Sequence, residues 1–275
     1  MKKTVLAITL TFVLVLSLVG TVSAVTNGAL DGNGHPYVGL MVAKDANGVP
    51  LWRCSGTLIS STIFLTAGHC TEAPAVTATI WFEADVQILG YDLSNLAMYP
   101  NGGPTTVSGT VYTHPQFVSA TFYLHDLGVV ELDTPVSMST YGKLPQLNVL
   151  DKYKTKRGLN PLTFTAVGYG MQQSFPDAAA WKDASQKIRM VAYPKLVQIG
   201  VPGFGGDYSI MLSNNTHTGG TCFGDSGGPN FIGNTNVIGG VTSFGKNGNC
   251  AGSGGVYRID QSDDLDWLAT FDVVP

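Results

Sequence analysis

The sequence predicts an antiparallel all-β protein, organised as barrels or as a sandwich. Many short runs are rich in β-branched or aromatic residues and are bounded by Gly, Pro, Asn or Asp, as strands are. No 10–15-residue helical pattern alternates with these runs, which disfavours parallel βαβ units. Glycine accounts for 34 of the 275 residues, a content typical of short strands joined by turns.

The expected elements follow one another along the chain. Strands are expected at 37–43, 56–67, 76–82, 127–132, 162–170, 187–194, 208–213, 236–244 and 255–259. The stretch 135–161 has little strand character and is expected to connect two β halves. One helix is expected at the C-terminus, where Ser262 can cap it and Leu265 and Leu268 share a face.

The first 24 residues have the pattern of a secretory signal peptide. A basic "MKK" precedes an apolar run, and "VSA" ending at Ala24 is a small-residue cleavage site. An uncleaved membrane anchor is the alternative, but the apolar run is slightly short for a bilayer span. We therefore expect a secreted, extracellular protein with no stable membrane association after signal cleavage.

The charge balance excludes some partners. Signal cleavage removes two of the 15 basic residues and none of the 19 acidic ones, so the net charge changes from −4 to −6. A mildly acidic chain without a basic run has no electrostatic reason to bind nucleic acid. No acidic loop has calcium-ligand spacing. We expect no metal and no cofactor, and we expect a monomer.

The four cysteines are Cys54, Cys70, Cys222 and Cys250. An even number in an exported chain favours two disulfides. Three connectivities are possible, and pairing of neighbours in the sequence is the simplest. A zinc site is the alternative, but the sequence contains no C-x-x-C pair to support it.

Ser226 lies in "GDSGG" (224–228), where a serine beside glycines is ordinary turn chemistry. The stretch also fits the G-x-S-x-G nucleophile turn of α/β-hydrolases, in which the catalytic histidine follows the serine. All five histidines of this chain precede Ser226, so that interpretation fails. The histidines are His35, His69, His114, His125 and His217.

The order His, Asp, Ser remains open. A serine hydroxyl needs a base, and the base needs a partner that orients it and stabilises its charged form. His69 lies in "LTAGHC", where a disulfide at Cys70 would clamp the backbone beside the imidazole. Asp126 lies in "HDLGVVELD", just before an apolar strand. His125 is an alternative base that lacks such a clamp.

Three blocks, "LTAGHC", "HDLGVVEL" and "GDSGGP", resemble in this order the catalytic blocks of the chymotrypsin-like (trypsin superfamily) serine proteases. "TSFG" (242–245) and "GVYRI" (255–259) resemble the family's substrate-binding and pocket-closing strands. The resemblance spans about residues 25–271 and is loose over about 85–110 and 140–190. It implies two packed antiparallel six-stranded β-barrels with a C-terminal helix, and the disulfides Cys54–Cys70 and Cys222–Cys250.

The resemblance also implies a division of the chain and a reaction. Residues 1–24 would be the signal peptide, 25–140 the N-terminal barrel, and 141–275 the C-terminal barrel with its helix, the two barrels forming one peptidase domain. The protein would be a serine endopeptidase acting on protein or peptide substrates. Ser226 would attack the scissile carbonyl, His69 would act as general base and then acid, and Asp126 would orient the imidazole.

Further roles follow from the same resemblance. The amides of Gly224 and Ser226 would form the oxyanion hole, and Ser243 would support the buried aspartate. For substrate binding, the position six before the nucleophile would be the pocket floor. The residues concerned are Gly220 and the following Thr221, then Ser243, Phe244, Gly245 and Gly255.

The predicted pocket disfavours basic substrate side chains. Gly220 carries no carboxylate that could pair with Arg or Lys. Gly245 and Gly255, at the expected walls, would leave room for a large side chain. We therefore predict an apolar or aromatic residue at P1, the substrate position before the scissile bond.

Activation is expected to differ from the animal pattern and to be of bacterial type. No Lys or Arg lies between Lys3 and Lys44, so the usual basic cleavage site is absent. Signal cleavage would instead expose "VTNG" at 25–28, similar to the family's "IVGG" start. The new ammonium of Val25 would then pair with Asp225.

Two other functions remain open. A non-catalytic binding protein can use the same fold, because a fold alone does not confer activity. Esterase activity would be a side reaction of the same acyl-transfer site. "NNT" at 214–216 also fits a glycosylation sequon at Asn214.

Overall fold

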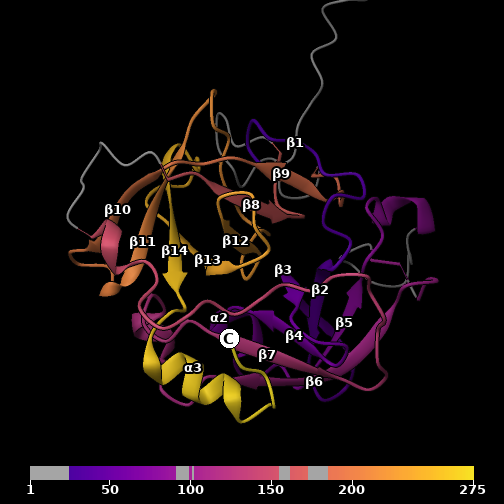
Figure 1. Cartoon of the computed structure of the whole chain (residues 1–275). Coiled ribbons are helices and arrows are strands. Elements are labelled where there is room, and N and C mark those ends of the chain that lie inside the picture. The colour runs from indigo at the N-terminus through magenta and orange to yellow at the C-terminus, as the bar shows by residue number, and fades with distance from the viewer. Residues whose placement is uncertain (1–24, 91–98, 101, 155–161, 173–184) are drawn as a thin grey trace, which may run out of the picture.

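The structure is a computed structural model, and it describes residues 25–90, 99–100, 102–154, 162–172 and 185–275. The expected signal peptide, 1–24, lies outside this part of the chain. Two antiparallel β units lie side by side, and the C-terminal helix lies beside the first of them (Figure 1). The antiparallel all-β class and the C-terminal helix predicted from the sequence are confirmed.

The first unit is a closed six-stranded barrel in the order β2-β3-β4-β7-β6-β5. Its interior is apolar: Leu40, Phe64 and Val130 are fully buried, and Phe64 pairs with Val130 across β4 and β7. Closure leaves this sheet no free edge. Its strands are β2 (Val38–Lys44), β3 (Pro50–Leu58), β4 (Ile63–Thr66), β5 (Thr77–Trp81), β6 (Val107–Thr113) and β7 (Gly128–Leu132).

The second unit differs from the expected six-stranded barrel. It is a curled sheet of eight strands in the order β1-β9-β8-β12-β13-β14-β11-β10. The extra edge strand β1 belongs to the N-terminal segment and pairs with β9 through Ala29 and Val191. Its strands are β1 (Ala29–Leu30), β8 (Phe164–Gly168), β9 (Met190–Ala192), β10 (Leu196–Val201), β11 (Gly206–Asn214), β12 (Pro229–Ile232), β13 (Ile238–Gly245) and β14 (Gly252–Arg258).

The strand expected at 56–67 is in fact a hairpin of β3 and β4. The Ser60 hydroxyl accepts hydrogen bonds from the amides of Thr62 at 3.3 Å and Ile63 at 3.1 Å, which turns the chain. The sequence analysis also missed β6, β10 and β12, whose short runs carry Gly, Gln or Pro. Turn chemistry and tertiary pairing overrode the local pattern at these places.

The C-terminal helix α3 (Ser262–Ala269) is present, but its cap was predicted wrongly. Ser262 is the first helical residue, and Gln261 occupies the cap position without a side-chain hydrogen bond. Its buried Leu265 and Leu268 belong to an apolar core cluster that contains residues of both β units. Short helical segments are α2 (Gly68–Thr71), η1 (Val86–Leu89), η2 (Ser119–Thr121) and η3 (Asp151–Tyr153).

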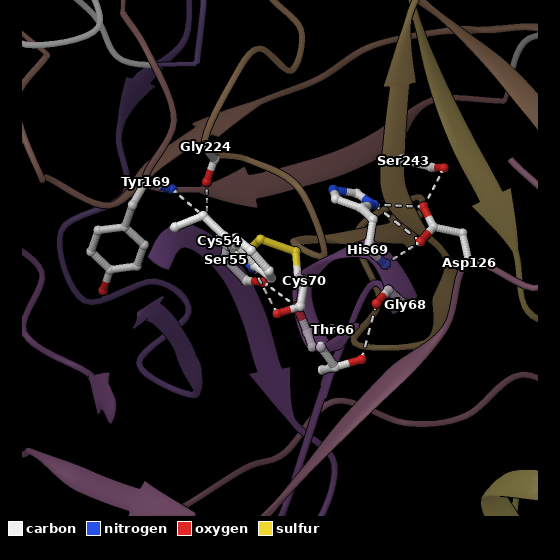
Figure 2. Close-up of a disulfide and its surroundings, with 12 residues drawn as sticks. Cys54, Ser55, Thr66, Gly68, His69, Cys70, Asp126, Tyr169, Gly224 and Ser243 are labelled. Carbon is white, nitrogen blue, oxygen red and sulfur yellow. Dashed lines mark hydrogen bonds and ion pairs between the residues drawn. A yellow bond between two sulfur atoms is a disulfide. The ribbon is translucent and has the colours of Figure 1, made fainter. Parts of the chain in front are cut away.

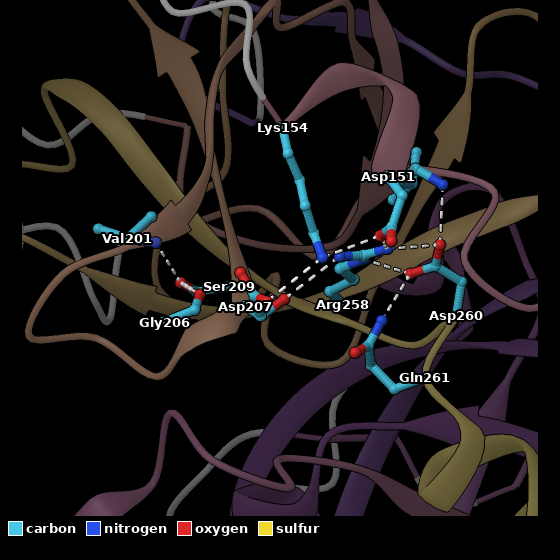
Figure 3. Close-up of polar contacts among 10 residues, drawn as sticks. Asp151, Lys154, Val201, Gly206, Asp207, Ser209, Arg258, Asp260 and Gln261 are labelled. Atoms are coloured by element: carbon cyan, nitrogen blue, oxygen red, sulfur yellow. Dashed lines mark hydrogen bonds and ion pairs between the residues drawn. The ribbon is translucent and has the colours of Figure 1, made fainter.

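A buried arginine anchors the end of β14 (Figure 3). The Arg258 guanidinium is fully buried and donates to Asp260 at 2.9 Å and to Asp151 at 2.5 Å. Asp260 also accepts the amide of Leu150 at 2.8 Å. Because a buried cation is costly unless it is paired, this network fixes the segment around η3 to the second sheet.

None of the helices in the described part of the chain has the length and apolar character needed to span a membrane.

Candidate active site

His69 lies in α2, directly after β4, at the edge of the first barrel. The disulfide Cys54–Cys70 ties this short helix to β3, and Figure 2 shows it beside the imidazole. Gly68 is needed for close approach, because a Cβ there would lie 3.1 Å from the backbone of Leu127. Both predicted disulfides, this one and Cys222–Cys250, are confirmed.

Asp126 is fully buried just before β7, and its carboxylate faces three donors (Figure 2). His69 Nδ1 lies 2.9 Å from Oδ2, and the His69 amide donates to Oδ1 at 2.9 Å. The hydroxyl of Ser243, from β13 of the second sheet, donates to Oδ2 at 2.5 Å. These contacts hold the Asp126 carboxylate in one orientation and favour the tautomer of His69 with its proton on Nδ1.

The environment of His69 suits a base. Burial alone would lower the pKa of the imidazole, but the charge of Asp126 and its hydrogen bond outweigh that effect and raise the pKa above the ordinary 6.5. The side chain remains 23% exposed, so Nε2 is left for a partner other than Asp126. A neutral, oriented imidazole with a raised pKa can accept a proton near neutral pH.

Ser226 lies in a tight turn that the sequence can form only with glycines. Gly227 has φ +76°, and a Cβ on it would lie 2.0 Å from the Thr66 hydroxyl. The Ser226 carbonyl accepts the amide of Ser55 at 2.8 Å, while Gly227 donates to the carbonyl of Thr242 at 2.8 Å. The turn is thus fastened to β3 of the first barrel on one side and to β13 on the other.

Two backbone amides of this turn are available for an anion. The Phe223 carbonyl accepts from Met171 at 2.9 Å, and the Asp225 carbonyl accepts from Gly228 at 2.8 Å. In trans peptides the N–H points opposite to the carbonyl, so the amides of Gly224 and Ser226 point away from these contacts. Neither amide donates to another residue within the described ranges. Gly224 has φ +94°, a conformation that favours glycine.

The structure joins His69, Asp126 and Ser243 directly and brings Ser226 to the same junction of the two β units. Within the described part of the chain, no hydrogen bond joins the Ser226 hydroxyl to His69. Serine and histidine of a catalytic pair often tighten only when substrate binds. Sequence analysis identified all four of these residues, because they lie in short, ordered motifs.

Ser55 was missed by sequence analysis although it holds the serine turn. Its hydroxyl donates to the Gly224 carbonyl at 2.9 Å and accepts the amide of Tyr169 at 2.9 Å (Figure 2). Its own amide donates to Ser226, as described above. One side chain on β3 therefore fixes the peptide planes around Gly224. The only sequence signal is its place directly after Cys54.

Asp225 is a buried carboxylate without a neighbouring ion-pair partner in the described residues. It accepts the amides of Gly170 at 2.8 Å and Cys222 at 2.9 Å. Burial raises its pKa to about 6, and the two amides and the charge of Arg53 only partly offset this. A cation placed here would stabilise the ionised form.

Val25 is linked to this carboxylate through a series of intermediate residues. Its side chain is fully buried and packs against Met190, which pairs with Gly168 across β9 and β8. A Cβ built on Gly168 would lie 2.3 Å from Asp225 Oδ1. In the full-length chain the nitrogen of Val25 is a peptide nitrogen, so the predicted ion pair is not formed in this structure.

The predicted pocket residues lie where β13 and β14 meet the serine turn, with one correction. Gly255 is covered by the Phe244 ring, 2.3 Å from an added Cβ, and leaves no room for a substrate. Its neighbour Gly254 is also buried and pairs with Gly245, and its Cβ would point at the Thr221 hydroxyl, 2.9 Å away.

The predicted floor residue, Gly220, faces a side chain that sequence analysis did not connect with it. A Cβ on Gly220 would lie 2.3 Å from Asn214 Cγ. Asn214 is 2% exposed, accepts the Thr26 hydroxyl at 2.8 Å and donates to the Thr221 carbonyl at 2.9 Å. Because both ends of its amide are engaged in the interior, the folded protein does not present this sequon for glycosylation.

Two groups of metal-type side chains gather in the described part of the chain. Cys54 and Cys70 are disulfide-bonded and offer no thiolate beside His69. The other group is His114, His125 and Asp264. The Asp264 carboxylate accepts the Tyr257 hydroxyl at 2.8 Å, and the imidazole Nδ1 of His114 accepts the amide of Gln116 at 3.3 Å, so these side chains have protein partners.

A His–Asp pair on one β unit beside a Gly-Asp-Ser-Gly-Gly turn on the other defines the class of chymotrypsin-like serine protease folds. Comparison with known families agrees, since the profile of the Trypsin family matches residues 29–268. The chain therefore belongs to the Trypsin family.

Two individual relatives are similar over most of this chain. Serine protease 1 of Drosophila melanogaster is 26% identical over 247 residues, which cover 89% of this chain and 84% of the relative. Brachyurin of Leptuca pugilator is 28% identical over 263 residues, covering 92% and 97%. A solved structure of HL collagenase has a TM-score of 0.67 and 22% identity, and covers 90% of this chain and 98% of its own. That likeness shows the fold.

Proposed function

We propose that the protein is a secreted serine endopeptidase that hydrolyses peptide bonds through a Ser226–His69–Asp126 triad and an acyl-enzyme. The observation that carries the proposal is the buried Asp126 carboxylate. It orients His69 through two contacts and is itself held by the Ser243 hydroxyl. An Asp–His pair with a purely structural role would need neither an exposed imidazole edge nor a neighbouring turn with two unpaired amides. Both features occur here, which favours a catalytic role. The Trypsin-family match over most of the chain supports the same reaction.

In the proposed acylation step, Ser226 Oγ forms a bond to the scissile carbonyl carbon and its proton passes to His69 Nε2. The Gly224 and Ser226 amides would receive the oxyanion, a contribution of about 3–4 kcal/mol per donor in comparable sites. The C–N bond then breaks, and His69 returns the proton to the leaving amine. Water repeats the sequence on the acyl-enzyme and regenerates Ser226.

The residues around the pair have supporting roles. The Asp126 carboxylate stabilises the imidazolium that forms in each step, and Ser243 holds that carboxylate in place. The raised pKa of His69 is the expected consequence of this arrangement. Activity should therefore fall as the pH drops below that pKa, because the protonated imidazole cannot accept the serine proton.

Activation in the proposal follows from signal cleavage after Ala24. The new ammonium of Val25 would pair with Asp225, whose buried carboxylate has a pKa raised to about 6 without a cation beside it. The route of contact through Met190 and Gly168 supports this pairing. No separate zymogen cleavage would be needed.

The proposed substrate site accepts an apolar or aromatic P1 residue and not Arg or Lys. The floor lacks a carboxylate at Gly220 and Thr221, while Gly245 and Gly254 leave the walls without side chains. Phe244 contributes a ring above Gly255. Peptide substrates, a monomeric state, secretion and the domain boundary near residue 140 belong to the same proposal.

Labelling with a serine-directed phosphonate tests the proposal. We expect one phosphonate per chain in the protein beginning at Val25, and none in Ser226→Ala. Ser137→Ala, a change at an exposed serine in the connection between the two β units, is the matched control and should label normally. Absence of labelling together with tight, unproductive peptide binding would favour the non-catalytic binding protein. Ester turnover without peptide turnover would favour an esterase.

A further inference from the structure

The direction in which a side chain on residue 220 would project is occupied by another residue. An added Cβ on Gly220 would lie 2.3 Å from Cγ and 2.7 Å from Oδ1 of Asn214. The Asn214 carboxamide therefore stands where the side chain of a floor residue would begin. The charge and size of the Asn214 side chain, and not those of residue 220, therefore decide which chemical group occupies this position.

Strand register places Asn214 on the same face of the sheet as Gly254. β11 and β14 pair without a bulge from Ser209 to Asn214, with Leu212 opposite Gly254 and Asn214 opposite Gly252. Residues two apart on a strand share a face. Asn214 and Gly254 therefore lie on one face of the sheet, the face on which a Gly254 Cβ would point at the Thr221 hydroxyl.

The amide is held in one orientation. Thr26 donates to Asn214 Oδ1 at 2.8 Å, and Nδ2 donates to the Thr221 carbonyl at 2.9 Å. A carboxamide has two N–H donors and an oxygen with two acceptor positions, so one donor and one acceptor position remain beyond these two bonds. The group is neutral, and its environment contains a carbonyl that would repel a negative charge.

We propose that Asn214 is a specificity-determining residue, whose carboxamide forms the base of the site that receives the substrate's P1 side chain. This inference rests on the proposed protease function and deepens it. A neutral base makes an uncharged P1 residue favourable and leaves a cationic one without a counter-charge. The assignment also explains why residue 220 is glycine, because any larger residue would displace the amide.

Asn214→Asp tests the assignment, with Asn215→Asp as the control. Asn215 is exposed and adjacent, so the control adds the same charge one residue away. In Asn214→Asp the new carboxylate would face the Thr221 carbonyl, and a cationic substrate side chain would compensate it. We expect the ratio of kcat/KM for P1 Arg over P1 Leu to rise by roughly tenfold or more, and to rise further with pH as the carboxylate ionises.

Peptides that differ only at P1 are compared at enzyme concentrations set by phosphonate labelling. The control should keep the wild-type ratio within about twofold. An unchanged Arg-to-Leu ratio in labelled Asn214→Asp, or an equal rise in the control, overturns the inference while leaving the protease proposal intact. A wild-type protein that does not label refutes the protease proposal itself, and this inference with it.

A second variant covers the case in which Asn214→Asp does not fold. Asn214→Ser is shorter and neutral, and keeps a hydroxyl for Thr26. It should deepen the site and raise the ratio of kcat/KM for P1 Phe over P1 Leu several-fold, without any gain for Arg. A wild-type P1 profile in folded Asn214→Ser would show that the side chain at 214 does not reach the substrate.

Discussion

The two halves of the candidate site differ in how far the fold alone completes them. On the first barrel, Asp126 has three hydrogen-bond donors and the Cys54–Cys70 disulfide holds α2 in place. On the second sheet, Asp225 is just as deeply buried but meets two backbone amides and no adjacent cation among the described residues. The Asp126 carboxylate is satisfied within the chain, whereas the burial cost of the Asp225 carboxylate is only partly offset.

This difference indicates which half of the candidate site could control activity. We call the part of the site around His69 and Asp126 the histidine half, and the part around Ser226 and Asp225 the serine half. The histidine half consists of groups that are present as soon as the first barrel closes. The serine half depends on a carboxylate whose raised pKa would be lowered by a cation, and in our proposal signal cleavage supplies that cation at Val25.

The largest effect is expected from breaking the histidine half. Asp126→Asn removes the negative charge and lets His69 adopt the wrong tautomer, so kcat should fall about 10⁴-fold. Steady-state peptide hydrolysis measures this, with thermal unfolding to show that the chain is folded. A loss smaller than tenfold in a folded variant would mean that His125, or no histidine, is the base.

A smaller effect is expected from leaving the serine half incomplete. A form that retains Ser23 and Ala24 before Val25 has no ammonium at Asp225. If Asp225 then fails to hold the Gly224 and Ser226 amides, kcat should fall on the order of 100-fold, the loss associated with one oxyanion donor. Full activity in this extended form would show that signal cleavage does not activate the protein.

The contact between the halves should contribute less. Ser243→Ala removes the hydroxyl that donates to Asp126 across the junction. Hydrogen bonds to charged groups contribute about 1.5–3 kcal/mol, so kcat/KM should fall between about tenfold and 100-fold. Ser243→Thr, which keeps a hydroxyl, is the matched variant and should recover part of the loss. Equal losses in both would point to packing in place of the hydrogen bond.

The smallest effect is on stability and depends on pH. In the extended form the pKa of Asp225 is raised from 3.8 to about 6, so the folded state favours the protonated acid and loses stability as pH rises from about 4 to 6. Pairing with Val25 removes that loss. Denaturant unfolding of both forms on a Ser226→Ala background, which prevents self-cleavage, should give equal stabilities near pH 4 and a gap of a few kcal/mol at pH 7. A gap that closes toward neutral pH contradicts the sign of this argument.

The sequence allowed prediction of the parts of the site that lie in contiguous motifs. His69, Asp126 and Ser226 each stand in a short run with its own turn glycines or cysteine, so they could be chosen as candidates without coordinates. Gly254 was not, because a bulge between Thr242 and Phe244 shifts the pairing of β13 with β14 by one residue. With this shift Gly254 pairs with Gly245, and Gly255 pairs with Phe244.

Long-range contacts were equally hidden. Asn214 meets Thr26 from 188 positions earlier in the chain, and nothing local in "NNT" indicates that partner. The open eight-stranded sheet was missed for a similar reason, because β1 is only two residues long and gains its place from pairing with β9. Elements defined by tertiary pairing leave little trace in a local pattern.

The carboxyl group of Asp225 offers the most direct test of the contrast between the two halves. Carbon-13 NMR can follow its titration in the form that retains Ser23 and Ala24 and in the form that begins at Val25, both carrying Ser226→Ala. We expect a pKa of about 6 in the extended form and a pKa below the ordinary 3.8 once the ammonium is paired. The same pKa in both forms would contradict the proposal that the N-terminus completes the site.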